Sequence, residues 1–134
     1  MSSYELLMEC LPAHLLVYLR QGAGGAAWPI SAIPAVIEAS RAAGLISVGG
    51  DLQVHLDESV WESPNIGVVI FSRELSGLDR LADEAAALAL KKFMALGREA
   101  DLLKEAAAGC PGVSEAIARG TPPQLYFSWS VRSA

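Results

Sequence analysis

The chain has 134 residues, of which 52% are hydrophobic and 19% are charged, and it carries a formal net charge of -5 at pH 7. A chain of this length forms one domain by default, and this hydrophobic fraction supplies enough apolar surface for a single packed core. Nucleic acid is not expected as a partner, because phosphate binding needs a local basic patch and the Lys and Arg residues are scattered. A basic protein surface is the more natural partner.

The N-terminus and the cysteines predict a cytoplasmic protein. Residues 1–5 lack the basic and apolar regions of a secretory signal, and no stretch approaches the roughly 18 apolar residues that span a membrane. Cys10 and Cys110 lie far apart in a sequence that can form a core, which favours two reduced thiols over a disulfide framework. A single bridge between them stays an open alternative.

The first segment, residues 4–20, is rich in leucine and contains Pro12, which ends or bends a helix that begins at the N-terminus. We expect a short helix or an extended lead-in, followed by a buried strand over residues 14–20, because residues 15–19 form a continuous apolar run. The pattern does not settle whether this segment is helix or strand. Residues 21–27 are glycine-rich and predict a flexible connection.

The next two elements have clearer signals. A helix is predicted over residues 32–43, with Ser31 as its N-cap and Gly44 just past its end. Alternation of apolar and polar residues then predicts a half-buried strand over residues 45–56. One face of this strand would carry Ile46, Val48, Leu52, Val54 and Leu56, and the other Ser47, Asp51, Gln53 and His55.

A hairpin and a long helix follow the alternating strand. Residues 57–65 are predicted to form its wide loop, and residues 66–71 to form the third strand. The sequence of residues 76–79 resembles a capping box with Asp in place of the usual Glu. Apolar residues at helical spacing then predict a helix that runs to about Leu96 and breaks at Gly97.

Three shorter elements complete the chain. Helical pieces are predicted over residues 98–108 and 114–119, and a last strand over residues 125–132. The resulting order is β-α-β-β-α-β with an extra helical segment before the last strand, the ferredoxin-like pattern. We therefore predict a single α+β domain over residues 1–134, with a largely antiparallel four-stranded sheet and helices on one face.

No residue pattern for a metal, a cofactor or a catalytic site is present. Cys10 and His14 could share a helix face with His55 as a third ligand, but Pro12 separates the first two and no zinc-binding motif exists. The polar strand face could lie opposite a serine such as Ser128 in a hydrolytic arrangement, yet a solvent-facing surface explains the same pattern. We predict no metal, no cofactor and no enzymatic activity.

Binding is the function that the sequence favours. The predicted loop joins a large aromatic side chain to three carboxylates, which can combine an apolar anchor with electrostatic steering. Trp61 could equally fold back over the edge of the core. The predicted partner-binding residues are Asp57, Glu58, Trp61 and Glu62 in the loop and Asp51, Gln53, His55 and Tyr126 on the polar sheet face.

The first half of the chain resembles a family of small bacterial immunity proteins found beside polymorphic or contact-dependent toxins. The resemblance rests on Trp28-Pro29, the helix after it, Ala-Ala-Gly-Leu at residues 42–45, the run at residues 48–55 and the acidic Glu62. It implies a cytoplasmic, acidic α+β protein that blocks a cognate toxin by occluding its active site. The alternatives are a small-molecule-binding domain or small enzyme with a pocket on the open sheet face, and a homodimer whose sheet faces meet.

Overall fold

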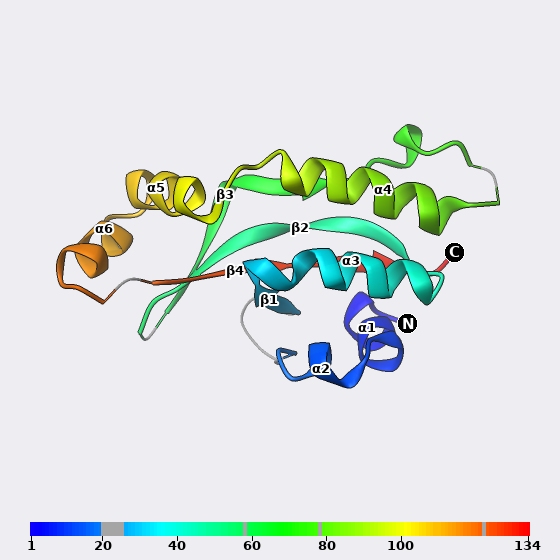
Figure 1. The fold of residues 1–134 in the computed structure, drawn as a ribbon, viewed down its shortest axis with the longest axis horizontal. Coiled ribbons are helices and arrows are strands. Elements are labelled where there is room, and N and C mark those ends of the chain that lie inside the picture. The colour runs from blue at the N-terminus through cyan, green and yellow to red at the C-terminus, as the bar shows by residue number, and fades with distance from the viewer. Residues whose placement is uncertain (20–25, 58, 78, 122) are drawn as a thin grey trace.

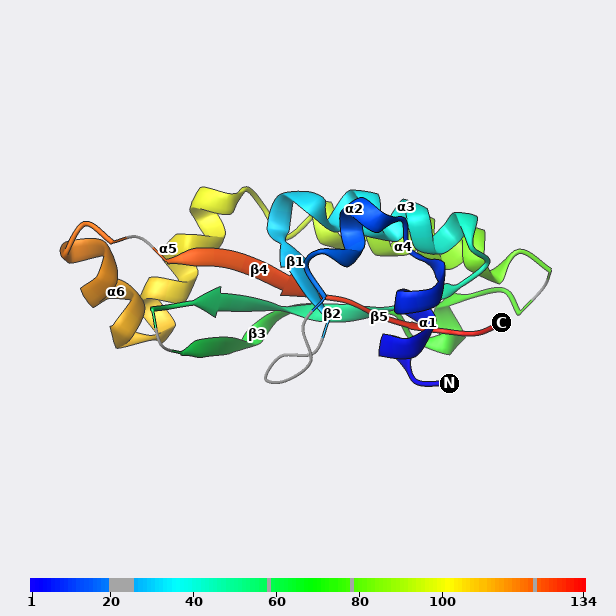
Figure 2. The ribbon, with the colours of Figure 1, turned by 90° about the horizontal axis from the view of Figure 1, so that it is seen from below.

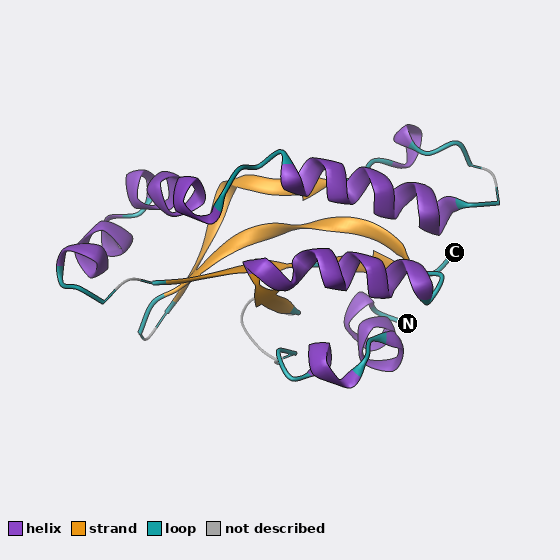
Figure 3. Cartoon of the chain, viewed as in Figure 1, coloured by secondary structure: helices purple, strands orange, loops and turns teal. Residues whose placement is uncertain are grey.

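Figure 1 shows the fold in a computed structural model, which describes residues 1–19, 26–57, 59–77, 79–121 and 123–134. Within these ranges, α-helices and a five-stranded antiparallel sheet form an α+β fold (Figure 3). The helices are α1 (Ser3–Cys10), α2 (Ala13–Leu16), α3 (Ile33–Ala42), α4 (Leu81–Met94), α5 (Glu99–Gly109) and α6 (Pro111–Ala118). The strands are β1 (Ala27–Pro29), β2 (Ile46–His55), β3 (Val60–Val69), β4 (Gln124–Ser128) and β5 (Ser130–Arg132).

Strand β2 lies in the interior of the sheet. The strand order is β1-β4-β2-β3, and β5 pairs with the half of β2 that β4 leaves free. Helices α3 and α4 lie on one face of the sheet, as Figure 2 shows. Helix α1 lies at the end that carries both termini, and α5 and α6 lie at the opposite end. In the described part of the chain, no helix crosses the middle of the other face, which we call the open face.

The core lies between the sheet and helices α3 and α4. Leu52 of β2 and Phe127 of β4 are register partners, and both side chains are fully buried. The Phe127 ring meets the Phe93 ring of α4 edge to face, with 5.3 Å between the ring centroids. Since side chains alternate between the faces of a strand, burial of these positions turns their neighbours in β2 and β4 toward the open face.

The N-terminal segment is helical, so the strand predicted over residues 14–20 is wrong. Helix α1 begins with a capping box in which the Ser2 Oγ accepts a hydrogen bond from the Glu5 amide at 3.2 Å. Helix α2 follows directly after Pro12. The apolar run is buried on one side only, because Val17 is 70% exposed. The buried leucines recur every four residues, which is helical spacing: Leu7, Leu11 and Leu15.

The first strand is β1, at a position where no strand was predicted. Trp28 lies in it, fully buried, and its Nε1 donates a hydrogen bond to the Leu15 carbonyl at 2.8 Å. This bond joins the N-terminal helices to the sheet. Residues 20–25, which include most of the predicted flexible connection, lie outside the described residues.

Helix α3 confirms the helix predicted over residues 32–43, but its predicted N-cap is wrong. Ser31 lies in a 3-10 turn at Ile30–Ala32 that precedes the helix, and no side chain caps it. Pro34 in the first turn has no N–H, so one fewer donor needs a capping partner. Gly44 ends the helix as predicted, with a φ of 76°.

Strand β2 confirms the predicted alternating strand, although its alternation is interrupted. Register shifts between Ser47 and Gly49, and between Asp51 and Gln53, break the regular pattern. Ser47 and Gln53 are only 1% and 2% exposed, so the prediction that both belong to a solvent-facing surface is wrong. The Ser47 Oγ accepts a hydrogen bond from Trp129 Nε1 at 3.1 Å, which explains how this hydroxyl is accommodated in the core.

The wide loop predicted over residues 57–65 is wrong, because β3 already begins at Val60. The turn of the hairpin therefore contains only the residues between His55 and Val60. Pro64, inside the predicted loop, lies in an irregular stretch of β3 where the two following amides donate to the Ser63 Oγ. Local turn chemistry inside a strand produced the misleading signal.

The long helix is confirmed as α4, but its predicted capping box is wrong. The helix begins at Leu81, and no side chain caps its N-terminus. The Ser76 Oγ instead donates a hydrogen bond to Glu84 Oε2 at 2.9 Å, one turn inside the helix. Gly97 marks the break after the helix, as predicted, with a φ of 106°.

The C-terminal elements agree with the prediction in type and differ in detail. Helix α5 matches the helix predicted over residues 98–108, and α6 begins three residues before the predicted 114–119. The last strand is divided into β4 and β5 at Trp129, whose amide donates to the Ala26 carbonyl at 3.1 Å instead of to β2. The predicted single strand therefore becomes two.

The order β1-α3-β2-β3-α4-β4 follows the predicted β-α-β-β-α-β order, with α5 and α6 as the extra helical segment. The sheet has five strands where four were predicted. The ferredoxin-like arrangement is not confirmed, because the strand order is β1-β4-β2-β3, with β1 at the edge beside β4 and with β5 as an additional strand beside β2. Both cysteines, Cys10 and Cys110, are free. Among the helices of the described ranges, none has the length and apolar character needed to cross a membrane.

Candidate functional site

The residues predicted for a polar sheet face meet around β2. Gln53 is the register partner of Tyr126 in β4 on one side and of Glu62 in β3 on the other. Partner residues in antiparallel strands point to the same face, so these three side chains form a row across the open face. His55, two residues further along β2, lies on the same side.

An aromatic and amide cluster stands at one end of this row. The rings of His55 and Tyr126 stack with 4.0 Å between their centroids and an interplanar angle of 7°. The His55 Nε2 lies 3.2 Å from Gln53 Oε1, and Gln53 is almost fully buried. These contacts fix the orientation of the two rings before any partner arrives, which lowers the entropic cost of binding to them.

A pair of carboxyl groups stands at the other end. Partial burial, the negative charge of Asp51 and a side-chain hydrogen bond with Asp51 together raise the pKa of Glu62. Gly67 of β3 makes room for this pair, since a Cβ at that position would lie 2.5 Å from Asp51 Oδ1. The Asp51 amide donates to the Ser128 Oγ at 2.9 Å, which holds the backbone of the acid in place.

A shallow pocket of about 360 Å³ opens beside the carboxyl pair. Helix α1 forms one wall with Tyr4, and β4 supplies Ser128. The wall is anchored to the sheet, because the Ser3 Oγ accepts a hydrogen bond from the Val131 amide at 2.9 Å. Asp51 and Glu62 therefore line a depression together with an aromatic ring and several hydroxyl groups.

A second, larger hollow lies at the other end of the sheet. This groove of about 580 Å³ separates the end of β2 from α6, and His55 belongs to its wall as well as to the open face. Asp57 of the hairpin turn lines it together with Glu115 and Arg119 of α6. The alternative prediction was a small-molecule pocket on the open sheet face, and of the residues predicted for that face His55 lines this groove; Arg119 is a lining residue that the sequence did not single out.

The residues of the predicted recognition loop are not all found together. Trp61 is half-buried against the core and lies on the side of α5, where its ring would be 3.5 Å from a Cβ at Gly109. The interpretation of Trp61 as a cover for the edge of the core is thereby confirmed. Glu62 points to the opposite face, Asp57 lines the groove, and Glu58 lies outside the described residues.

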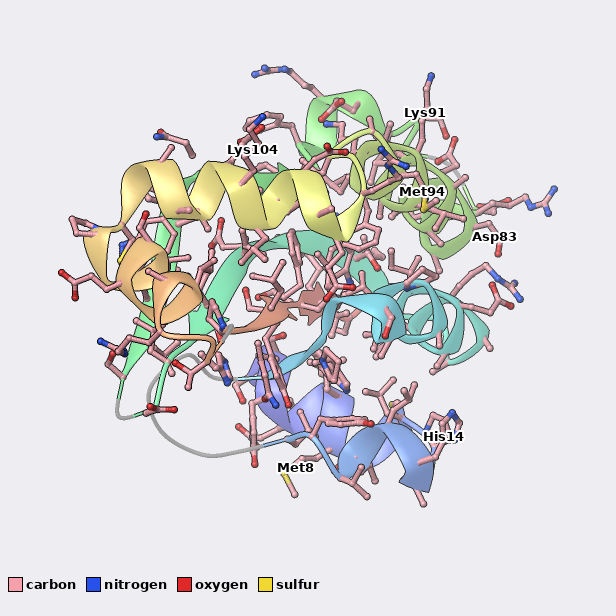
Figure 4. All side chains as sticks on the ribbon, turned by 60° about the vertical axis from the view of Figure 1, so that its left-hand side comes forward. Met8, His14, Asp83, Lys91, Met94 and Lys104 are labelled. Atoms are coloured by element: carbon pink, nitrogen blue, oxygen red, sulfur yellow. The ribbon has the colours of Figure 1, made fainter. Side chains whose placement is uncertain are left out.

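Positive charge is displayed on the helical side of the molecule. Lys91 of α4 and Lys104 of α5 project from the outer surfaces of their helices in Figure 4. Asp51 and Glu62 lie across the sheet, on the open face.

The described part of the chain contains no group of three or more His, Cys, Asp or Glu side chains that could hold a metal ion.

The register of the strands determines which of the predicted site residues lie close together. The alternation in β2 and β4 was enough to group Asp51, Gln53, His55 and Tyr126, and the structure confirms that they share a face. Pairing of Asp51 with Glu62 had no signal in the sequence, because it depends on an irregular register between β2 and β3.

Comparison of the chain with protein-family models, with curated proteins and with solved structures finds no match.

Proposed function

We propose that the chain is a non-enzymatic binding protein whose open face receives a basic surface of a partner protein. The Asp51–Glu62 pair carries this proposal. Two carboxyl groups held close together on one face repel each other when both are ionised, and this repulsion contributes to the raised pKa of Glu62. A guanidinium or ammonium group of a partner would relieve this repulsion and gain charge-assisted hydrogen bonds from both acids.

The surroundings of the acid pair support the same proposal. The stacked His55 and Tyr126 rings offer a rigid apolar surface one row away, and tyrosine is enriched among residues that dominate binding energy. The net charge of -5 favours encounter with a basic protein. The proposal also includes Asp57, which lines the adjoining groove, Glu58, which lies outside the described residues, and Trp61, which packs against the core.

Within this class we propose an immunity protein that neutralises a cognate bacterial toxin by covering its active site. The resemblance of residues 28–62 to such proteins supports this assignment, as does the acidic character of the chain. The proposal includes a cytoplasmic location, which two free thiols favour. It includes neither nucleic acid nor a membrane as a partner.

The first test is affinity capture of the tagged chain from its native cells at low and moderate salt, with mass spectrometry of the retained proteins. We expect one stoichiometric basic partner. Its association rate with the purified chain should fall as salt rises, because the attraction is screened. The double substitution Asp51→Asn with Glu62→Gln should slow association and weaken binding, since it removes both charges from the open face.

A charge-matched control separates the open face from general electrostatics. Asp79→Asn with Glu105→Gln removes the same charge from exposed positions elsewhere. Equal loss of binding in the two double variants would show that the open face is not the interface. Light scattering on the chain alone tests the homodimer alternative. If the chain self-associates and the open-face double variant abolishes this self-association, the partner of the open face is a second copy of the chain.

A further inference from the structure

The groove between β2 and α6 has the dimensions of a small-ligand site. Its volume of about 580 Å³ lies within the usual range for such sites. One wall comes from the end of β2 and the hairpin turn, and the other from α6 and the segment that leads into β4. Of the residues proposed to bind a protein partner, His55 and Asp57 also line this groove.

Three charged side chains in this groove make no ion pair or side-chain hydrogen bond within the described ranges: Asp57, Glu115 and Arg119. Elsewhere in the described ranges, Arg41, Arg80 and Arg98 are each paired with an acid, whereas Arg73 and Arg132, like Arg119, are not. Arg119 directly follows α6, one turn beyond Glu115. The groove therefore presents two negative groups and one positive group that can bond to a ligand.

The walls of the groove are held in place by contacts outside it. The stack on Tyr126 fixes the His55 ring. Gly112 of α6 lies beside Leu56, since a Cβ there would be in van der Waals contact with Leu56 Cδ1 at 3.4 Å. Thr121 bonds through its amide and its hydroxyl to the Ala116 carbonyl, which fixes the turn after α6. A ligand would consequently meet a preformed site.

We propose that this groove binds a small basic amino acid, with the ligand carboxylate on Arg119 and its two cationic groups on Asp57 and Glu115. We choose this ligand from the charges of the groove. A basic amino acid has two positive groups and one negative group, which complement the two acids and the one arginine. Arg119 can hold a carboxylate through two parallel hydrogen bonds. Gln124 and Thr121 add polar groups at the rim.

The test is an NMR titration of the full isotope-labelled chain with L-lysine and L-arginine. We expect saturable shifts of the amide signals of Gly112, Thr121 and Gln124. Cadaverine lacks the carboxylate and L-norleucine lacks the side-chain amine, so both should bind several-fold more weakly. Absence of saturable shifts with lysine and arginine overturns the site. Equal binding of norleucine or of cadaverine overturns the assigned role of the corresponding charge.

Two variants place the ligand within the groove. Arg119→Gln and Glu115→Gln should each weaken lysine binding by roughly tenfold, the usual effect of losing a charge-assisted hydrogen bond. Arg98→Gln and Glu105→Gln remove the same charges from α5 and its N-cap and should leave the affinity unchanged. Affinities that do not differ between the two sets would place the ligand elsewhere. These substitutions leave Asp51 and Glu62 intact, so failure here does not bear on the protein-binding proposal.

Discussion

Asp51 and Glu62, eleven positions apart in the sequence, lie close together on neighbouring strands of the open face, and the negative charge of Asp51 contributes to the raised pKa of Glu62. The two acids are not register partners: Asp51 lies opposite Gly67, and Glu62 lies opposite Gln53. The irregular stretch of β3 between Glu62 and Gly67 brings the two side chains together. A defect in strand register thus creates the most acidic point of the candidate site.

The raised pKa of Glu62 predicts a pH-dependent contribution to stability. A carboxyl with a higher pKa in the folded than in the unfolded chain favours folding below its unfolded pKa, and this contribution is lost as pH rises through the folded pKa. Glu62→Gln should therefore raise the free energy of unfolding more at about pH 7 than at about pH 4. Denaturant unfolding at both pH values measures this, with Glu105→Gln as the control. A pH-independent difference would contradict the acid pairing.

Gly67→Ala should disturb the acid pair and destabilise the fold. The added methyl group would lie 2.5 Å from Asp51 Oδ1 and 2.9 Å from the Gly50 carbonyl oxygen. We expect a loss of about 1–3 kcal/mol in the free energy of unfolding, the typical cost of overpacking. Chemical denaturation compares this variant with Gly109→Ala, whose methyl group would make ordinary contact with Trp61 at 3.5 Å. Equal stability of the two variants would argue against the close approach at Gly67.

The stack between His55 and Tyr126 predicts a measurable coupling energy. The two residues are diagonal neighbours on adjacent antiparallel strands, with parallel rings in contact. A double-mutant cycle with His55→Ala and Tyr126→Ala should give a coupling of about 0.5–1 kcal/mol. Tyr126→Phe should retain most of it, because the ring remains. Additive single substitutions would show that the stack does not stabilise the face.

The hydrogen bond from Trp28 to Leu15 predicts that the N-terminal helices depend on β1. Trp28→Phe removes the Nε1 donor and leaves the buried Leu15 carbonyl without this partner. We expect a loss of about 1–3 kcal/mol in the free energy of unfolding, together with faster hydrogen exchange in α1 and α2. Val17→Ala, at a 70% exposed position, is the control and should change stability by less than about 0.5 kcal/mol. Unchanged exchange in the Trp28 variant would contradict the proposed anchoring.

Patterns that depend on local spacing were predictable from the sequence. The helices at residues 33–42 and 81–94 and the alternating strands at residues 46–55 and 124–132 all appear close to their predicted positions. Their apolar residues recur with the period of the element, so a single strand or helix reveals which face will be buried. The grouping of Asp51, Gln53, His55 and Tyr126 followed from this periodicity alone.

Errors arose where a local signal had two physical explanations. The apolar run at residues 15–19 suited a buried strand, but it begins inside α2 and is buried on one side only, since Val17 is exposed. Pro64 and Asn65 lie inside the predicted loop, yet Ser63 satisfies the amides that an irregular strand leaves unpaired. Ser76 suited a helix cap, yet its hydroxyl donates to Glu84 inside the helix.

The sequence by itself determined the class of the fold, the order of its main elements and the identity of the polar strand positions, because hydrophobic periodicity is a property of each segment alone. The tertiary structure decided the rest. It turned Trp61 toward α5, brought Glu62 against Asp51, and set Asp57 across the groove from Arg119. These relationships depend on strand register and on the packing of helices that are distant in the chain, and neither is written in the spacing of neighbouring residues.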